Sequence, residues 1–185
     1  MGLRTAFKSA AGFSLTDVMM AAAIGATMAG ISVPMVKQAM DSMRLASATR
    51  DVERELQTAR LRAVSKNRPF TLRLNCPAAG QYRLIEITGV PATDNAANRC
   101  DPNAFPYPGP RDNDPATPAF DGPVRYMHSE LTAAGETLLF RPTGVTQKWT
   151  TGVTTAVTTP VELSLTRGND SKKVTVNGLG KIQIK

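Results

Sequence analysis

Few side chains in this sequence could do chemistry, and the two cysteines come first. Cys76 and Cys100 do not form a C-x-x-C pair, so neither a redox motif nor a zinc motif is present. His128 is the only histidine that could join them around a metal, and we therefore expect no metal site. In an oxidising compartment the two cysteines could form one disulfide, and the alternative is two free thiols.

Catalytic motifs are also missing. The sequence contains no G-x-S-x-G turn, no P-loop and no dinucleotide-binding glycine motif. No spacing of Ser, His and Asp residues singles out a catalytic triad around His128. We therefore predict that the protein is not an enzyme and needs no cofactor.

Asp17 is a charged side chain in an unusual place. It is the only charged residue between positions 13 and 36, and Val18–Val36 after it contains no ionisable side chain over 19 residues. As a helix this run would be about 28 Å long, close to the thickness of a bilayer's hydrocarbon core. An acid there is costly unless it finds a partner. A local explanation is a helix start of the form Ser14-x-x-Asp17, with the acid favoured by the helix dipole.

Several interpretations of this N-terminus compete. Residues 1–12 carry Arg4 and Lys8 and no acid. A secretory signal peptide has a shorter apolar stretch, of about 7–15 residues, followed by its cleavage site. A signal anchor fits the length of the run, and it would hold a periplasmic binding domain without any role in a filament.

A third interpretation comes from a motif. The string Gly12-Phe13-Ser14-Leu15-Thr16-Asp17 resembles the cleavage site of prepilins, G-F-[ST]-L-x-E. The resemblance implies that prepilin peptidase removes a leader, residues 1–12, by cutting between Gly12 and Phe13, and that the new amine of Phe13 is methylated. It also implies that residues 13–36 stay on the mature protein, first as a transmembrane helix and then in the filament core.

The same resemblance assigns assembly roles to two residues of the helix. Asp17 stands where pilins usually carry the longer glutamate, whose partner is the N-terminal amine of a neighbouring subunit. Pro34 matches a proline that is common in pilin helices.

The next segment, residues 37–67, predicts an amphipathic helix. Its apolar residues recur at spacings of 3 and 4 and form one narrow stripe that needs a sheet to pack on. Asn67-Arg68-Pro69 ends the helix, because a proline disfavours helix in the residue before it. The stripe consists of Leu45, Ala48, Val52, Leu56, Ala59 and Ala63.

Residues 68–185 predict a β-rich globular domain, interrupted by a proline-rich loop at 88–123. Short strands with hairpin spacing favour an antiparallel sheet. The fold class is therefore α+β, with a long N-terminal helix packed on the sheet. The expected strands are 70–74, 81–87, 124–127, 137–141, 161–166, 173–177 and 181–184.

The order of motifs resembles the GspH/FimT group of minor pilins and pseudopilins. The resemblance rests on the helix end Glu55–Val64, on Leu139–Gly144 and on the closing hairpin Val174–Lys181. It implies a pilin-like fold and a structural subunit of a type IV pilus or a type II secretion system, placed at the start or tip of the filament. Its partners would be prepilin peptidase, other pilins and the inner membrane, with the globular domain in the periplasm.

The net charge of +7 leaves open a further function. Some FimT-like pilins bind DNA through a G-R-x-R motif, and the matching positions here are Gly180-Lys181-Ile182-Gln183. The alternative is a soluble basic hairpin that binds no nucleic acid. The bases that would contact phosphates are Arg167, Lys172, Lys173, Lys181 and Lys185.

Overall fold

The computed structural model describes residues 12, 14–110, 114, 116–128, 130–150 and 152–185. The chain forms two compact units, one ending at Met40 and the other covering Asp41–Lys185. Helix α1 (Leu15–Lys66) contributes to both units. The expected leader lies outside the described residues except for Gly12, and Phe13 lies outside them as well.

The first unit consists, as far as the structure describes it, of the apolar half of α1. Every described residue from Ser14 to Met40 is exposed. A window of 18 residues in α1 has a mean hydropathy of 1.7, so by length and composition the helix is apolar enough to cross a membrane. Pro34 lies inside the helix and has no N–H, so it leaves the carbonyl of Gly30 without its usual helical donor.

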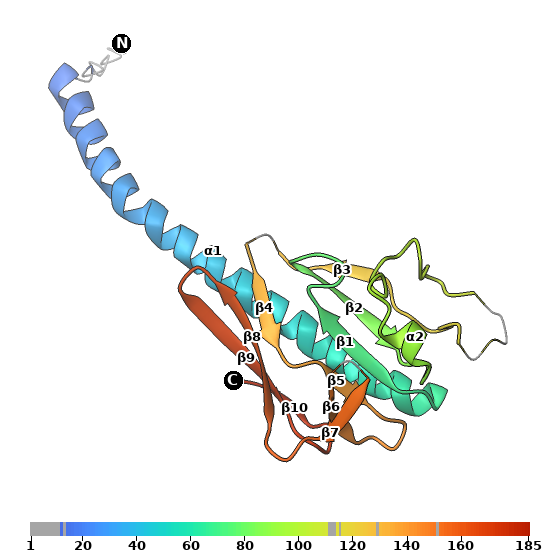
Figure 1. Ribbon diagram of the computed structural model, residues 1–185. Coiled ribbons are helices and arrows are strands. Elements are labelled where there is room, and N and C mark those ends of the chain that lie inside the picture. Colours follow the sequence, from blue (N-terminus) through green and yellow to red (C-terminus); the bar gives the residue numbers. More distant parts are fainter. Residues whose placement is uncertain (1–11, 13, 111–113, 115, 129, 151) are drawn as a thin grey trace, which may run out of the picture. The chain divides into compact units, whose positions relative to one another are not determined.

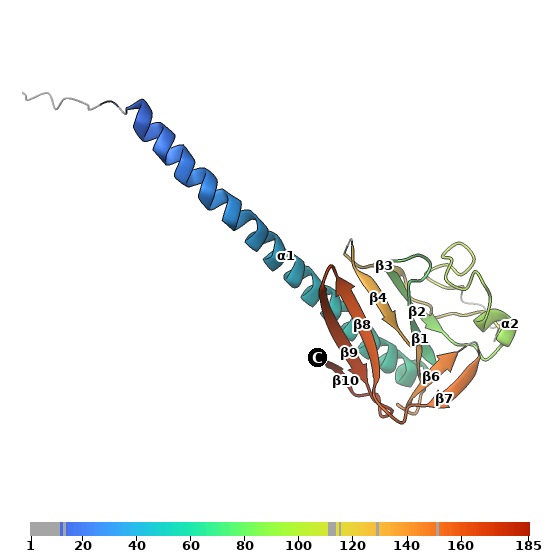
Figure 2. The same ribbon diagram turned by 60° about the vertical axis from the view of Figure 1, so that its left-hand side comes forward.

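The second unit contains two antiparallel sheets that share one core with the other half of α1 (Figures 1 and 2). The six-stranded sheet has the order β3-β2-β1-β5-β6-β7, and the four-stranded sheet has the order β10-β9-β8-β4. The six strands are β1 (Phe70–Leu74), β2 (Gln81–Glu86), β3 (Val124–Tyr126), β5 (Leu138–Phe140), β6 (Thr146–Thr150) and β7 (Val153–Ala156). The other four are β4 (Thr132–Gly135), β8 (Val161–Arg167), β9 (Asp170–Val176) and β10 (Ile182–Ile184).

The apolar stripe of α1 is confirmed, because all six of its predicted members are buried. Thr49 is buried beside them, and its hydroxyl donates to the carbonyl of Leu45 at 2.7 Å. The stripe packs against residues of both sheets, including Phe70 and Leu72 of β1 and Leu165 of β8. The predicted α+β fold, a long helix on antiparallel sheet, is confirmed.

All seven predicted strands are present, with small shifts at their ends. Strand β9 begins at Asp170, earlier than expected, because a two-residue turn pairs Asp170 with Arg167. The turn needs a residue with positive φ, and Gly168 has a φ of 58°. Three strands and one short helix, α2 (Pro91–Asp94), were not predicted. The missed strands β4 and β7 consist mostly of Thr, Ala and Gly, and the missed strand β6 has Trp149 as its only apolar residue, so all three carry little apolar alternation.

Candidate functional site

The start of α1 holds the acid that the sequence singled out. The backbone N–H of Ser14 donates to Oδ2 of Asp17 at 3.2 Å, and the N–H of Asp17 donates to the carbonyl of Ser14 at 3.0 Å. The Ser14 hydroxyl instead lies 2.8 Å from the hydroxyl of Thr16. Only half of a capping box is formed, and the carboxylate of Asp17 stays exposed on the first turn of the helix.

None of the residues that the structure describes covers the apolar surface after Asp17. Large side chains such as Leu15, Met20 and Ile31 are each more than 70% exposed, although a soluble domain would bury them. A contiguous apolar surface of this length normally contacts a membrane or another protein. The first unit therefore has the character of an anchor or an assembly segment, and Pro34 lies within it.

The second unit contains a group of buried charges that fixes the proline-rich loop to β2. Arg83 is fully buried, and its guanidinium donates to the carbonyl of Gly122 at 2.8 Å and to that of Phe105 at 2.6 Å. Burial lowers the pKa of Arg83 from its ordinary value, while the negative charge of Asp121 opposes this effect. The arginine thus holds two distant parts of the loop against one strand.

A second arginine completes this group from the loop side. Arg99 is fully buried and forms an ion pair with both carboxylate oxygens of Asp121. Asp121 also accepts the N–H of Glu86 at 2.8 Å, and the Glu86 carboxylate accepts the N–H groups of Ala119 and Phe120. We call Arg83, Glu86, Arg99 and Asp121 the loop anchor.

The two cysteines lie next to the loop anchor. Cys76 and Cys100 form a disulfide with their Cα atoms 5.3 Å apart, and Cys76 is buried. The bond joins the turn after β1 to the proline-rich loop. It is a covalent link that adds to the hydrogen bonds and ion pairs of the loop anchor. Nearby, the Asp94 carboxylate accepts the N–H groups of Thr88 at 2.9 Å and Gly89 at 2.8 Å. The loop is therefore held at several points along its length.

The bases proposed for nucleic acid do not share one environment. Arg167 is buried and forms ion pairs with Asp41 and Glu130, each at 2.9 Å. The ammonium of Lys173 pairs with Glu162 at 2.6 Å. This pairing lowers the pKa of the Glu162 carboxyl. Lys172, Lys181 and Lys185 are at least partly exposed on or next to β9 and β10.

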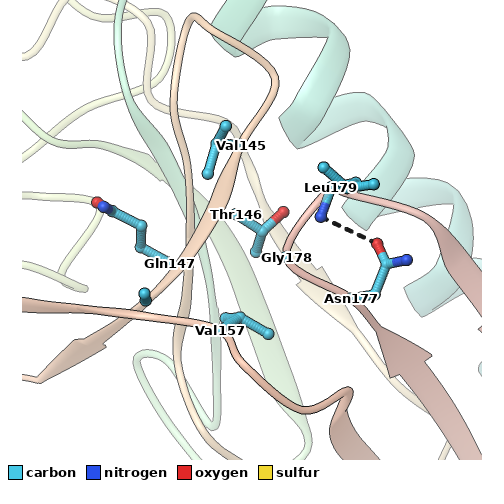
Figure 3. A pocket seen from close by; sticks show the side chains of 8 residues that line it. Val145, Thr146, Gln147, Val157, Asn177, Gly178 and Leu179 are labelled. Carbon is cyan, nitrogen blue, oxygen red and sulfur yellow. Dashed lines mark hydrogen bonds between the residues drawn. The ribbon is translucent and has the colours of Figure 1, made fainter.

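A small recess of about 330 Å³ lies between β6, β7 and the turn that precedes β10 (Figure 3). The N–H of Leu179 donates to Oδ1 of Asn177 at 3.1 Å and shapes this turn. Gly178 is required there, since a Cβ would lie 2.6 Å from the carbonyl oxygen of Val157. The motif Gly178-Leu179-Gly180 is thus explained by close packing.

Comparisons with known proteins agree with the resemblance. The family model for the type II transport protein GspH matches residues 48–180. A comparison with curated proteins gives no match. Among solved structures, the type IV minor pilin FimU of Pseudomonas aeruginosa matches with 16% identity and a TM-score of 0.45, covering 76% of this chain and 87% of that one. The minor pseudopilin EpsH of the Vibrio cholerae type 2 secretion system matches with 12% identity and a TM-score of 0.44, covering 77% and 96%.

The family match covers most of the second unit, from Ala48 in α1 onward, and it includes every strand except β10. It therefore confirms the resemblance predicted from the motifs. The chain belongs to the family of the type II transport protein GspH.

Proposed function

We propose that the protein is a minor pilin or pseudopilin, made as a precursor and assembled into a type IV pilus or a type II secretion pseudopilus. Prepilin peptidase removes residues 1–12 by cutting between Gly12 and Phe13, and the amine of Phe13 is methylated. The observation that carries the proposal is the uncovered apolar helix, which begins at Leu15, within the cleavage motif and three residues after Gly12.

In this proposal the helix of residues 13–36 first spans the inner membrane and holds the second unit in the periplasm. The mean hydropathy and length of this part of α1 support a membrane segment. The disulfide supports the location of the second unit, because the periplasm is oxidising. During assembly the same helix leaves the lipid and packs against the helices of other subunits.

Asp17 and Pro34 have separate roles in that packing. The exposed carboxylate of Asp17 pairs with the methylated amine of Phe13 in a neighbouring subunit, which sets the axial position of the helix. Pro34 leaves the carbonyl of Gly30 without a helical donor, so the helix can loosen locally as it packs. The Ser14–Asp17 hydrogen bond holds the carboxylate near the helix start and supports this pairing.

The proposal is tested by variants of the cleavage motif and of the acid in the native host. Changing Gly12 to an aspartate should leave the leader uncut and keep the protein out of the sheared filament fraction. A matched control is Val153→Ala, at a position on β7 that is 63% exposed and lies outside the assembly helix, and this variant should be cut and assembled normally. Normal assembly of the uncut Gly12 variant would refute the proposal.

Asp17 is tested separately from cleavage. Asp17→Ala should be cut but should enter filaments at about a tenth of the normal level, since its loss leaves the neighbouring amine unpaired. Asp17→Glu, which restores the usual pilin residue, should assemble normally. Full assembly of Asp17→Ala would remove the assigned role of this residue.

Nucleic-acid binding has less support than assembly. Arg167 and Lys173 already pair with carboxylates of the chain, and Lys181 and Gln183 replace the two arginines of the binding motif. A mobility-shift assay with double-stranded DNA at low salt tests this function, and binding that weakens as salt rises would support it.

A further inference from the structure

A groove of about 600 Å³ lies beside the C-terminal half of α1. One wall is formed by Gln57, Arg60, Leu61 and Val64 of the helix, and the other by Gly144 and Gly180–Ile182. All of these residues belong to the second unit. The groove is separate from the apolar helix of the first unit.

The helix wall of this groove is a second stripe that the fold itself does not use. Gln57, Arg60, Leu61 and Val64 recur at spacings of 3, 1 and 3, so they share one face of α1. Leu61 is 69% exposed and Val64 is 54% exposed, whereas the neighbouring stripe residues Ala59 and Ala63 are completely buried. A surface with adjacent exposed aliphatic side chains is typical of a contact with another molecule.

Two cations border this apolar floor without an acidic partner among the described residues. The Arg60 guanidinium and the Lys181 ammonium form no described ion pair, whereas the three buried arginines, Arg83, Arg99 and Arg167, all do. Glu53 lies about two helical turns before Arg60, and its carboxylate accepts a hydrogen bond from the amide of Gln57 at 3.2 Å. The groove therefore combines an aliphatic floor with two available positive charges.

The far wall is held in place by glycine. Gly180 has a φ of 74°, and a Cβ there would lie 2.8 Å from Nε of Arg60 and 3.0 Å from the carbonyl oxygen of Gly144. The turn is further fixed by hydrogen bonds from Lys181 N–H and Leu179 N–H to Oδ1 of Asn177. The groove thus exists before a partner binds, which lowers the entropic cost of binding.

We propose that this groove binds a segment of a neighbouring pilin-type subunit that carries a carboxylate beside aliphatic side chains. The carboxylate pairs with Arg60 and Lys181, and the aliphatic side chains cover Leu61 and Val64. The aliphatic floor favours a peptide over a nucleic-acid backbone, which would need a continuous line of cations. The inference rests on the proposed function, since it names a partner within the same filament.

The test uses the full chain in its native host, with a photoreactive phenylalanine analogue in place of Leu61. Irradiation should give an adduct with another pilin-type subunit, at a peptide that contains Asp or Glu next to aliphatic residues. The matched control is the analogue in place of Val153, which is 63% exposed on β7 and lies outside the groove. The control should give no such adduct.

Charge reversal then tests the pairing. The double variant Arg60→Glu, Lys181→Glu should lower the yield of the adduct by about tenfold, and changing the partner's carboxylate to lysine should restore most of it. The control Arg54→Glu, on an exposed position of the same helix outside the groove, should leave the yield unchanged. Restoration by the reversed partner is a result that simple unfolding would not give.

Several outcomes overturn the proposal. These are no adduct at Leu61, an adduct with a second copy of this chain, an adduct that a nuclease shortens, and a yield that charge reversal does not change. The assembly of Asp17→Ala, measured in parallel, distinguishes failure of the groove proposal from failure of the proposed function. If it blocks assembly while the groove fails these tests, the groove proposal is wrong and the proposed function remains.

Discussion

Asp121 faces two arginines that are both fully buried, Arg83 and Arg99. Removing the charge of such an acid leaves two uncompensated cations away from water. Asp121→Asn keeps the shape of the side chain, and we expect it to lower the free energy of unfolding by about 3–5 kcal/mol. Urea denaturation of the full chain in detergent measures this, with the single tryptophan, Trp149, as the fluorescent probe because it is largely buried in the second unit.

The control for this variant is Asp114→Asn. Asp114 is exposed and accepts the N–H of Ala116 at 2.9 Å, a bond that asparagine can keep. Its effect should stay within about 0.5 kcal/mol. Equal losses in the two variants would show that the loop anchor contributes nothing particular to stability.

Tyr82 gives a pH dependence at the alkaline end. Burial, helped by the negative charges of Glu55 and Asp51, raises its pKa to about 12 from the ordinary 10.0. The folded state therefore disfavours the phenolate, so this contribution to stability is complete below pH 10 and is lost as the pH rises towards 12. We therefore expect the free energy of unfolding to fall more for the wild type than for Tyr82→Phe between pH 10 and pH 12.

The measurement is the urea midpoint of the two proteins between pH 8 and pH 12, reported as their difference, so that other titrating groups cancel. Wild type should lose stability faster than Tyr82→Phe above pH 10, because only wild type can ionise this phenol after unfolding. A difference that stays constant over the whole interval would contradict the raised pKa.

At the scale of elements, α1 carries two stripes with different purposes, and a matched pair of variants separates them. Leu56 is 1% exposed and Leu61 is 69% exposed on the same helix. Leu56→Ala should cost about 2–5 kcal/mol through lost contacts and a cavity. Leu61→Ala should change the free energy of unfolding by less than about 0.5 kcal/mol. Similar losses for both would mean that Leu61 is part of the folded core.

The disulfide is a property of the β1–β2 hairpin and the loop together. It closes a loop with a sequence separation of 24, and such a bond stabilises a protein by about 3 kcal/mol, mainly by restricting the unfolded chain. Replacing both cysteines with serine should lower the free energy of unfolding by about that amount. Reduction of the wild type should have the same effect, and a native mass that shows two free thiols would contradict the bond.

The elements that periodicity marks strongly could be predicted from the sequence. The stripe from Leu45 to Ala63 follows from the helical period alone, and all of its members are buried as expected. The loop anchor could not be predicted in this way. Side chains alternate along β2, so Arg83 lies on the face opposite to Tyr82 and Leu84. A side chain on that face is expected to contact solvent unless a distant segment covers it.

The walls of the groove could likewise not be predicted from the sequence alone. Gln57, Arg60, Leu61 and Val64 lie close together on one helix face, yet Lys181 joins them only because Gly180 brings its turn against Arg60. A signal for this contact exists in the sequence as the motif Gly178-Leu179-Gly180, but a glycine-rich turn does not say which surface it meets. Contacts between distant segments need the structure.

At the scale of the whole molecule, the two units differ in what stabilises them. The second unit has a continuous core, buried ion pairs and a disulfide. The first unit exposes its apolar side chains, so its stability depends on a membrane or on other helices. This division is compatible with the proposed passage of the helix from a membrane into a filament.

The central claim is that the apolar helix stays on the mature protein after the leader has been removed. Mass spectrometry of the native protein, purified from the membrane and filament fractions of its host, tests this most directly. The account predicts a chain that starts at N-methylated Phe13 and retains the apolar helix. A native chain that starts at Met1, or at any residue beyond the apolar helix, would contradict it.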